Sequence, residues 1–230
     1  MALTVVIPLL LALVAKSTRS EGFIKAVAYM LTLLLSGNFF AHYLYHWQSH
    51  DLTLEKSLPI QLCDAALVAT LAALLTRNQH CFDLAYFWGL GGTLQAIITP
   101  NLGSDFPSFI FISFFITHSG IVIGVFFMIF AMHLRPYPIS LFWVVFWSEI
   151  YLLFTLLINR WIGGNYGFLS HKPRGVSLLS FLSDWHSLYI LEMNLIAVVL
   201  FLILYLPFFL MDRVSRLRGF SLESRRSVDY

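Results

Sequence analysis

The sequence predicts an all-α fold, a polytopic membrane helix bundle with about seven transmembrane helices. Hydrophobic residues make up 59% of the 230 residues and charged residues only 11%, whereas soluble domains contain about 25% charged residues. Apolar runs of about 18 residues or more recur along the chain, which is the length needed to cross a bilayer. We therefore expect a single transmembrane helical domain over residues 1–212, followed by a basic cytoplasmic tail over residues 213–230.

Polar and turn-forming residues set the limits of each span. In chain order, the predicted spans are residues 2–16, 23–47, 58–75, 82–99, 108–133, 138–159 and 188–210. In the same order, the breaks between them are Lys16–Glu21, Asp51–Lys56, Arg77–His80, Pro100–Pro107, Arg135–Pro138 and Arg160–Asp184. Each break contains charged residues or proline, which are unfavourable inside a membrane helix or favour a turn. The first run lacks the basic start of a signal peptide, so we interpret it as a short first span.

Basic residues orient the predicted bundle. Lys16, Arg19, Arg77 and Arg135 fall in loops on one side, and the five arginines of the tail fall there too. Because cytoplasmic loops carry the excess of lysine and arginine, we expect a multi-pass protein of the cell membrane, with its N-terminus outside and its C-terminus in the cytoplasm. The loop around Lys172 is basic on the opposite side. A net charge of +2 gives no reason to expect nucleic acid, and the oligomeric state stays open.

Unusual polar residues gather near the outer ends of the predicted spans. Cys63 and Gln95 lie about 7 Å below that face at 1.5 Å per residue, and His118 lies about 15 Å below it. Gln61 and Asp64 flank Cys63, and the loop with Asn165 and Tyr166 lies on the same side. Polar groups are costly in hydrocarbon, so each one is a candidate site residue. A thiol and an imidazole are also the minimum pair for nucleophilic acyl chemistry.

Each candidate also has a structural interpretation. Free cysteines usually behave as small buried apolar residues, and a membrane histidine can simply link two helices. His42 and His46 have the spacing of metal ligands, but no carboxylate completes a metal signature, so we expect neither a metal nor another cofactor. Cys63 and Cys81 lie near opposite ends of successive segments, so we predict two free thiols. The remaining unusual residues are Glu149, expected to be protonated or paired, and Gly89, Gly91 and Gly92, expected to form a helix-packing seam.

The motifs resemble those of the YwaF-like family of bacterial integral membrane proteins along nearly the whole chain. They include Leu-Pro-Ile-Gln-Leu-Cys at 58–63, Tyr-Phe-Trp-Gly-Leu-Gly-Gly-Thr-Leu-Gln-Ala at 86–96, Ile-Thr-Pro at 98–100, Phe-Pro-Ser-Phe at 106–109, Thr-His-Ser-Gly at 117–120, Asn-Tyr at 165–166, Lys-Pro at 172–173 and Leu-Tyr-Leu-Pro-Phe at 204–208. That family is similar to an animal transmembrane acyltransferase that remodels ether phospholipids. The resemblance implies Cys63 and His118 as the catalytic cysteine and histidine, and membrane phospholipids as substrates. Asp64 stands at a position that varies.

Three functions fit these residues. The first is an acyltransferase or transacylase that forms a thioester on Cys63 with His118 as base, while Gln61 or Gln95 donates to the oxyanion. In this scheme Asp64, Asn165 and Tyr166 help to position the substrate. The second is a non-enzymatic lipid or small-molecule transporter or binding protein, and the third is an intramembrane lipid hydrolase. The sequence alone does not identify the acyl donor or acceptor.

Overall fold

The structure, a computed structural model, describes residues 20–100, 102–173, 175 and 177–226. The predicted first span, 2–16, lies outside them. The described residues are all-helical, as the sequence predicted, and form no strand. In chain order, the elements are α2 Glu21–Gln48, α3 Leu62–Thr76, α4 Gln79–Trp88, the π-helix η1 Gly89–Thr93, α5 Leu94–Ile98, α6 Phe109–Phe130, α7 Pro138–Ile162, the short 3-10 helices η2 Tyr166–Phe168 and η3 Leu178–Phe181, and α8 His186–Arg226.

Four helices of the described residues are long and apolar enough to cross a membrane: α2, α6, α7 and the part of α8 from His186 to Ser215. The predicted span 58–75 is the shorter apolar helix α3, and the predicted span 82–99 is the continuous series α4, η1 and α5. The predicted span 188–210 lies inside the apolar part of α8, and the helix itself continues through the arginine-rich residues to Arg226 with Pro207 inside it. Charged side chains do not end a helix on leaving the hydrocarbon, since lysine, arginine and glutamate are good helix formers.

Local chemistry explains where the helices begin. Ser20 and Ser108 cap α2 and α6, and their hydroxyl oxygens accept from the backbone N–H groups three residues later, both at 3.3 Å. Asn78 caps α4 in the same way at 3.1 Å. The helix α7 begins at Pro138, which needs no hydrogen-bond partner for its nitrogen. Each of these residues lies in a predicted break between spans or is the first residue of a predicted span.

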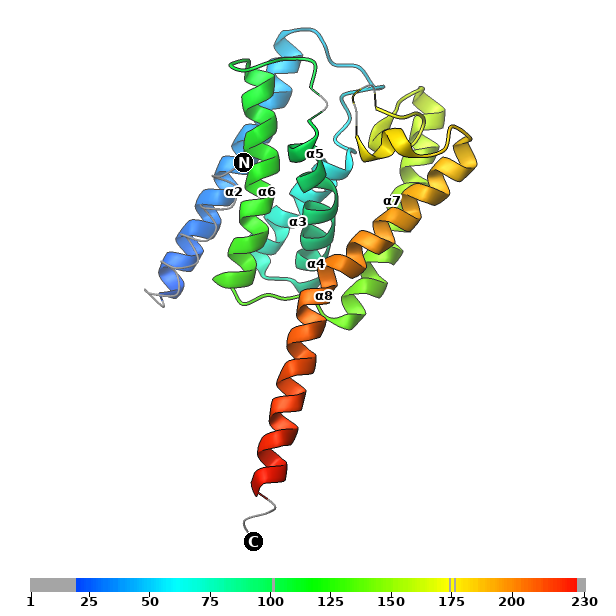
Figure 1. The fold of residues 1–230 in the computed structure, drawn as a ribbon. Coiled ribbons are helices and arrows are strands. Elements are labelled where there is room, and N and C mark those ends of the chain that lie inside the picture. Colours follow the sequence, from blue (N-terminus) through cyan, green and yellow to red (C-terminus); the bar gives the residue numbers. More distant parts are fainter. Residues whose placement is uncertain (1–19, 101, 174, 176, 227–230) are drawn as a thin grey trace.

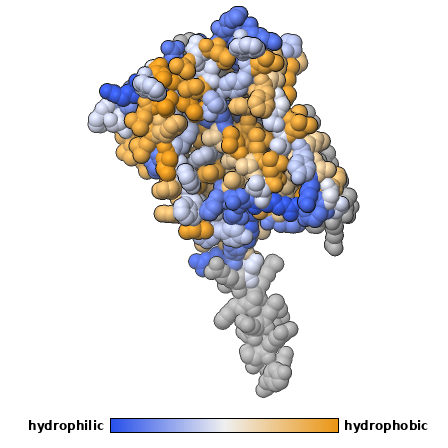
Figure 2. All heavy atoms as spheres, turned by 180° about the vertical axis from the view of Figure 1, so that it is seen from behind, coloured by the Kyte–Doolittle hydropathy of each residue, from blue (hydrophilic) through white to orange (hydrophobic). Residues whose placement is uncertain are grey.

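The core forms where α3 packs against α2, α4 and α6, and α2 and α6 also pack against each other (Figure 1). Leu35, Leu67, Phe87 and Ile121 are fully buried there. Helices α7 and α8 lie on the other side of α4 (Figure 1), and few of the residues in their apolar stretches are buried. Figure 2 shows hydrophobic side chains over the middle of one face and hydrophilic ones gathered toward two ends. That distribution is expected of a bundle surrounded by lipid.

Successive helices run in opposite directions and bring their loops to two ends (Figure 1). The C-terminal ends of α2, α5 and α7 and the N-terminal ends of α3, α6 and α8 point toward the end drawn uppermost. The predicted site residues therefore share one half of the bundle. At the opposite end, an ion pair at 2.7 Å joins Arg77 to Glu21, and the loop residue Arg135 pairs with Asp212 of α8 at 2.5 Å. The hydrogen bond to Asp212 raises the pKa of Arg135, so this guanidinium stays charged.

Candidate functional site

A cavity of about 940 Å³ occupies the half of the bundle that holds the polar residues. This volume lies within the range of small-molecule sites, about 300–1,000 Å³. The predicted site residues Cys63, His118, Gln61, Gln95 and Asp64 all line it. Apolar side chains of α8 form another part of the wall, namely Met193, Ile196, Ala197 and Leu200. The cavity thus combines a cluster of reactive polar groups with a hydrophobic surface.

Cys63 lies in the first turn of α3. The residue before the helix, Gln61, has an extended backbone (ψ 151°) and precedes Leu62 as the N-cap. The Gln61 backbone N–H donates to an oxygen of Asp64 at 3.1 Å, which fixes this turn. The positive end of the helix dipole favours an anion at this position, whereas partial burial of the thiol opposes ionisation. Cys63 therefore needs an adjacent base to become a nucleophile.

His118 is held by its own helix. Its Nδ1 is 2.7 Å from the carbonyl oxygen of Phe114, and the imidazole stacks on the Phe114 ring with centroids 3.8 Å apart. A carbonyl can only accept, so Nδ1 carries the proton and the neutral ring leaves Nε2 as an acceptor. The side chain is 8% exposed and lines the cavity. The carbonyl of Phe114 thus fixes the tautomer that a general base requires, the task that the aspartate performs in a catalytic triad.

The two glutamines supply amide donors. Gln61 accepts a hydrogen bond from the backbone N–H of Gly167 at 3.0 Å through its Oε1, which turns its NH₂ group to other partners. Within the described part of the chain, neither this NH₂ group nor the side chain of Gln95 forms a hydrogen bond to another residue. Because Gln61 precedes the helix, its side chain reaches the cavity that also contains the thiol. Both amides are available to a bound carbonyl or oxyanion.

The glycine-rich segment Gly89–Thr93 adopts a π-helix rather than an α-helix. Its glycines allow close approach: a Cβ on Gly89 would lie 2.9 Å from Ile121 of α6, and one on Gly92 would lie 2.9 Å from Leu62 of α3. The expected packing seam is therefore present at these two positions. The π-turn also brings the buried Thr93 beside Cys63. Such turns occur frequently at functional sites.

Asn165 and Tyr166 do not line the cavity, although the sequence placed them near the substrate. The Tyr166 hydroxyl accepts from the backbone N–H of Leu58 at 2.7 Å and donates to the carbonyl of Leu54 at 2.8 Å. Burial raises the pKa of Tyr166, so the phenol stays neutral. Asn165 accepts from the backbone N–H groups of Ser170 and His171. These residues shape the loops that carry Gln61 and Gly167.

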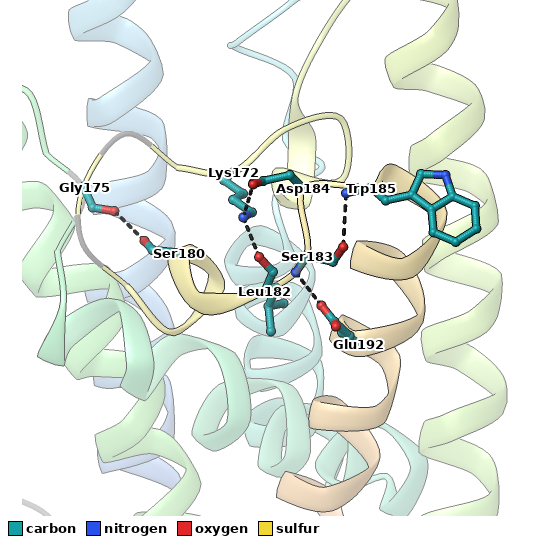
Figure 3. A network of polar contacts seen from close by, with 8 residues as sticks. All are labelled: Lys172, Gly175, Ser180, Leu182, Ser183, Asp184, Trp185 and Glu192. Carbon is teal, nitrogen blue, oxygen red and sulfur yellow. Dashed lines mark hydrogen bonds and ion pairs between the residues drawn. The ribbon is translucent and has the colours of Figure 1, made fainter.

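A second loop precedes α8 and is held by a network of polar contacts (Figure 3). The Lys172 ammonium donates to the carbonyl of Leu182 at 2.5 Å and to Asp184 at 2.6 Å. The backbone N–H of Ser183 donates to Glu192 of α8 at 2.6 Å. This hydrogen bonding from Lys172 keeps the pKa of Asp184 below its usual range. The segment between these anchors contributes further residues to the cavity wall, namely Pro173, Gly175, Ser177, Leu178 and Leu179.

The other polar residues expected from the sequence have varied surroundings. His42 and His46 line the cavity with ring centroids 4.6 Å apart, and no group of three potential metal-ligating side chains occurs among the described residues. Glu149 of α7 does not line the cavity. Cys63 and Cys81 are both free thiols, as predicted.

Sequence reasoning missed several residues of the site. Thr93 follows Gly91-Gly92 directly, and this pattern could have indicated a polar group at a close helix contact. Tyr151 of α7, whose hydroxyl donates to the carbonyl of Ile60 at 2.9 Å just before the start of α3, gave no signal in an apolar span. The single lysine of the wall, Lys56, was treated only as part of a loop.

Comparison with known proteins identifies a family. The sequence profile of the TMEM164 family matches residues 1–205. An uncharacterized protein of Treponema pallidum (strain Nichols) is 28% identical over 154 residues, which are 67% of this chain and 63% of the relative, so the chain covers less than two thirds of that protein. No solved structure matches. The motifs pointed to the YwaF-like family, but the profile match supports a different family label. The chain belongs to the TMEM164 family.

Proposed function

We propose that this membrane protein is a cysteine–histidine acyltransferase that moves a fatty acyl chain between lipids. The observation that carries the proposal is the cavity itself, which is lined by a thiol, an imidazole whose Nδ1 donates to a backbone carbonyl, two amides and an apolar wall. These groups supply a nucleophile, a base and oxyanion donors. The motif resemblance described above, to a family related to an animal ether-phospholipid acyltransferase, supports phospholipids as substrates.

In the first half of the reaction, Cys63 takes the acyl group. His118 Nε2 accepts the thiol proton as sulfur attacks the ester carbonyl carbon of the donor lipid, and a C–S bond forms. The amide NH₂ groups of Gln95 and Gln61 donate to the oxyanion. The ester C–O bond then breaks, and the proton passes from Nε2 to the departing lysolipid oxygen. A thioester on Cys63 remains.

In the second half, an acceptor hydroxyl takes the acyl group. His118 Nε2 removes the hydroxyl proton while the oxygen attacks the thioester carbon. The C–S bond breaks, and the proton returns from Nε2 to the sulfur of Cys63. The apolar side chains of α8 hold the acyl chain, because they line the cavity at Met193, Ile196 and Leu200. Asp64 fixes the first turn of α3, and its role is to position Cys63.

Product analysis tests this function against its two rivals. The purified protein is incubated with a phospholipid that carries a labelled acyl chain, with and without a lysophospholipid acceptor. A transferase moves the label to the acceptor, a hydrolase releases labelled fatty acid, and a binding protein leaves the label on the donor. We expect acceptor-dependent transfer that is lost in Cys63→Ser, because a serine hydroxyl is a much poorer nucleophile without a strong base. Transfer at the wild-type rate by Cys63→Ser would refute the proposal.

We also propose that the cavity faces the outer leaflet of the bacterial plasma membrane, with the basic C-terminal tail in the cytoplasm. The excess of arginine in the tail supports this orientation. A cysteine introduced at Ser104, in the loop before α6, should react with a membrane-impermeant maleimide in intact cells. A cysteine at Ser215, near the other end of α8, should react only after lysis. The reverse pattern would place the site at the cytoplasmic leaflet.

A further inference from the structure

Thr93 has a buried hydroxyl that its own helix does not use. Its side chain is 0% exposed, and its Oγ1 has no hydrogen-bond partner within the described residues. Other threonines of the bundle behave differently: Thr70, Thr76 and Thr99 donate to the carbonyl four residues earlier, at 2.7, 2.7 and 3.1 Å. A buried hydroxyl without a hydrogen-bond partner lowers the stability of the fold by about 1–3 kcal/mol. The unpaired hydroxyl of Thr93 therefore needs an explanation.

The π-turn accounts for the different geometry of Thr93. The carbonyl of Gly89, four residues before Thr93, accepts the backbone N–H of Leu94 in the wider π-type ring. The close contact of Gly92 with Leu62 then presses this turn against the start of α3. As a result, the Thr93 hydroxyl lies beside the Cys63 thiol without a hydrogen bond of ordinary geometry. Two other buried threonine hydroxyls lack a partner among the described residues, those of Thr32 and Thr155. None of the three threonines lines the cavity, and Thr93 is the one that lies beside Cys63.

We propose that Thr93 is a positioning residue that donates a hydrogen bond to the Cys63 thiolate and aims it into the cavity. This inference rests on the proposed function. A neutral thiol is a weak acceptor, whereas a thiolate attracts a hydroxyl donor strongly. The hydrogen bond therefore forms when His118 removes the proton, and it stabilises the sulfur anion that attacks the lipid ester. The glycine-rich π-turn leaves the Thr93 hydroxyl without a hydrogen bond to its own helix, so that it can donate to the thiolate.

The alkylation rate of Cys63 measures this hydrogen bond without any lipid substrate. The experiment uses iodoacetamide on the full chain with Cys81→Ala, so that only Cys63 reacts. Thr93→Val removes the hydroxyl and preserves the shape of the side chain, whereas Thr93→Ser keeps the hydroxyl. We expect Thr93→Val to slow alkylation at pH 8 about tenfold, the low end of what a hydrogen bond to a charged group provides. Thr93→Ser should remain within about twofold of the parent protein.

A pH profile separates this role from a loss of packing. The rates of the Thr93→Val and parent proteins should converge at high pH, where both thiols ionise. The ionisable groups next to the thiol are Asp64 and Tyr151, and His118 lines the same cavity. All three are unchanged in both variants. If Thr93→Val does not fold, Thr93→Ala takes its place. Equal rates for the valine and parent proteins at every pH, or a serine variant as slow as valine, would overturn the proposal. Slower alkylation with no lipid transfer would instead refute the proposed function alone.

Discussion

Replacing Gly120 by alanine should destabilise the bundle beside His118. Gly120 lies on α6, where the helix crosses α2. A Cβ at this position would overlap Leu35 Cδ2 and would lie 3.3 Å from Leu35 Cγ and 3.6 Å from Leu35 Cδ1. Carbon atoms in contact normally lie about 3.5–4.0 Å apart. Either Leu35 must adopt another rotamer or the two helices must separate.

The size of the effect follows from the surroundings of Leu35. Its side chain is 0% exposed, so the displaced methyl group has no open space to enter. Overpacking a filled core costs about 1–3 kcal/mol, and we expect Gly120→Ala to fall in this range. Separation of α2 and α6 would also disturb the hydrogen bond from Asn38 of α2 to Thr117 of α6, now 2.8 Å long. Activity should therefore fall together with stability.

The assay is reversible unfolding in mixed detergent micelles, followed by circular dichroism. Gly37→Ala is the matched control, because this glycine also lies in a membrane helix but a Cβ added to it would meet no neighbouring atom within 4 Å. It should be at least as stable as the parent protein. The double variant Gly120→Ala with Leu35→Ala should lose less free energy of unfolding than the two single variants lose together, because the smaller side chain at position 35 removes the clash. Parent-like stability of Gly120→Ala would refute the packing argument.

Two further predictions concern the loops at the cavity. Asn159→Leu should lower the free energy of unfolding by about 3 kcal/mol in the same assay. The substitution leaves the backbone N–H and carbonyl of Tyr166 without the hydrogen bonds, both of 2.9 Å, that the buried Asn159 amide now forms with them. An unchanged free energy of unfolding would contradict this. The Lys172–Asp184 ion pair should stabilise its loop fully at pH values above the ordinary carboxyl pKa of about 4. This stabilisation should be lost as the pH falls through the lowered pKa of Asp184. Limited proteolysis of the loop should therefore accelerate in acid, and Asp184→Asn should show the faster cleavage already at pH 7.

The sequence was sufficient for the helical class and for most span positions, because apolar runs and their polar breaks are local features. The predicted span 58–75 began four residues before α3 does, at Leu62. The end of α8 was not predictable from hydropathy, since the helix continues beyond Arg213. Hydropathy shows where a membrane helix leaves the hydrocarbon, and it does not show where the helix ends.

The candidate site could likewise be predicted from the sequence only in part. Cys63, His118 and Gln95 come from different helices, and the alternating direction of the spans was enough to place them in one half of the bundle. The π-turn that brings in Thr93 depends on contacts with Leu62 and Ile121 from other helices, so no local pattern specified it. The loop with Asn165 and Tyr166 depends on partners more than 100 residues away, at Leu54 and Leu58, which a single sequence cannot reveal.

Mass spectrometry of the lipid-treated protein tests the central claim most directly. After incubation with a phospholipid, peptide mapping should find an acyl group on Cys63 that neutral hydroxylamine removes. His118→Gln should slow its formation by about 10²–10⁴-fold, the usual contribution of a general base, and Cys81→Ala should leave it unchanged. The account predicts this hydroxylamine-sensitive thioester on Cys63. No adduct on Cys63 while acyl transfer proceeds, or an adduct that forms equally fast in His118→Gln, would contradict it.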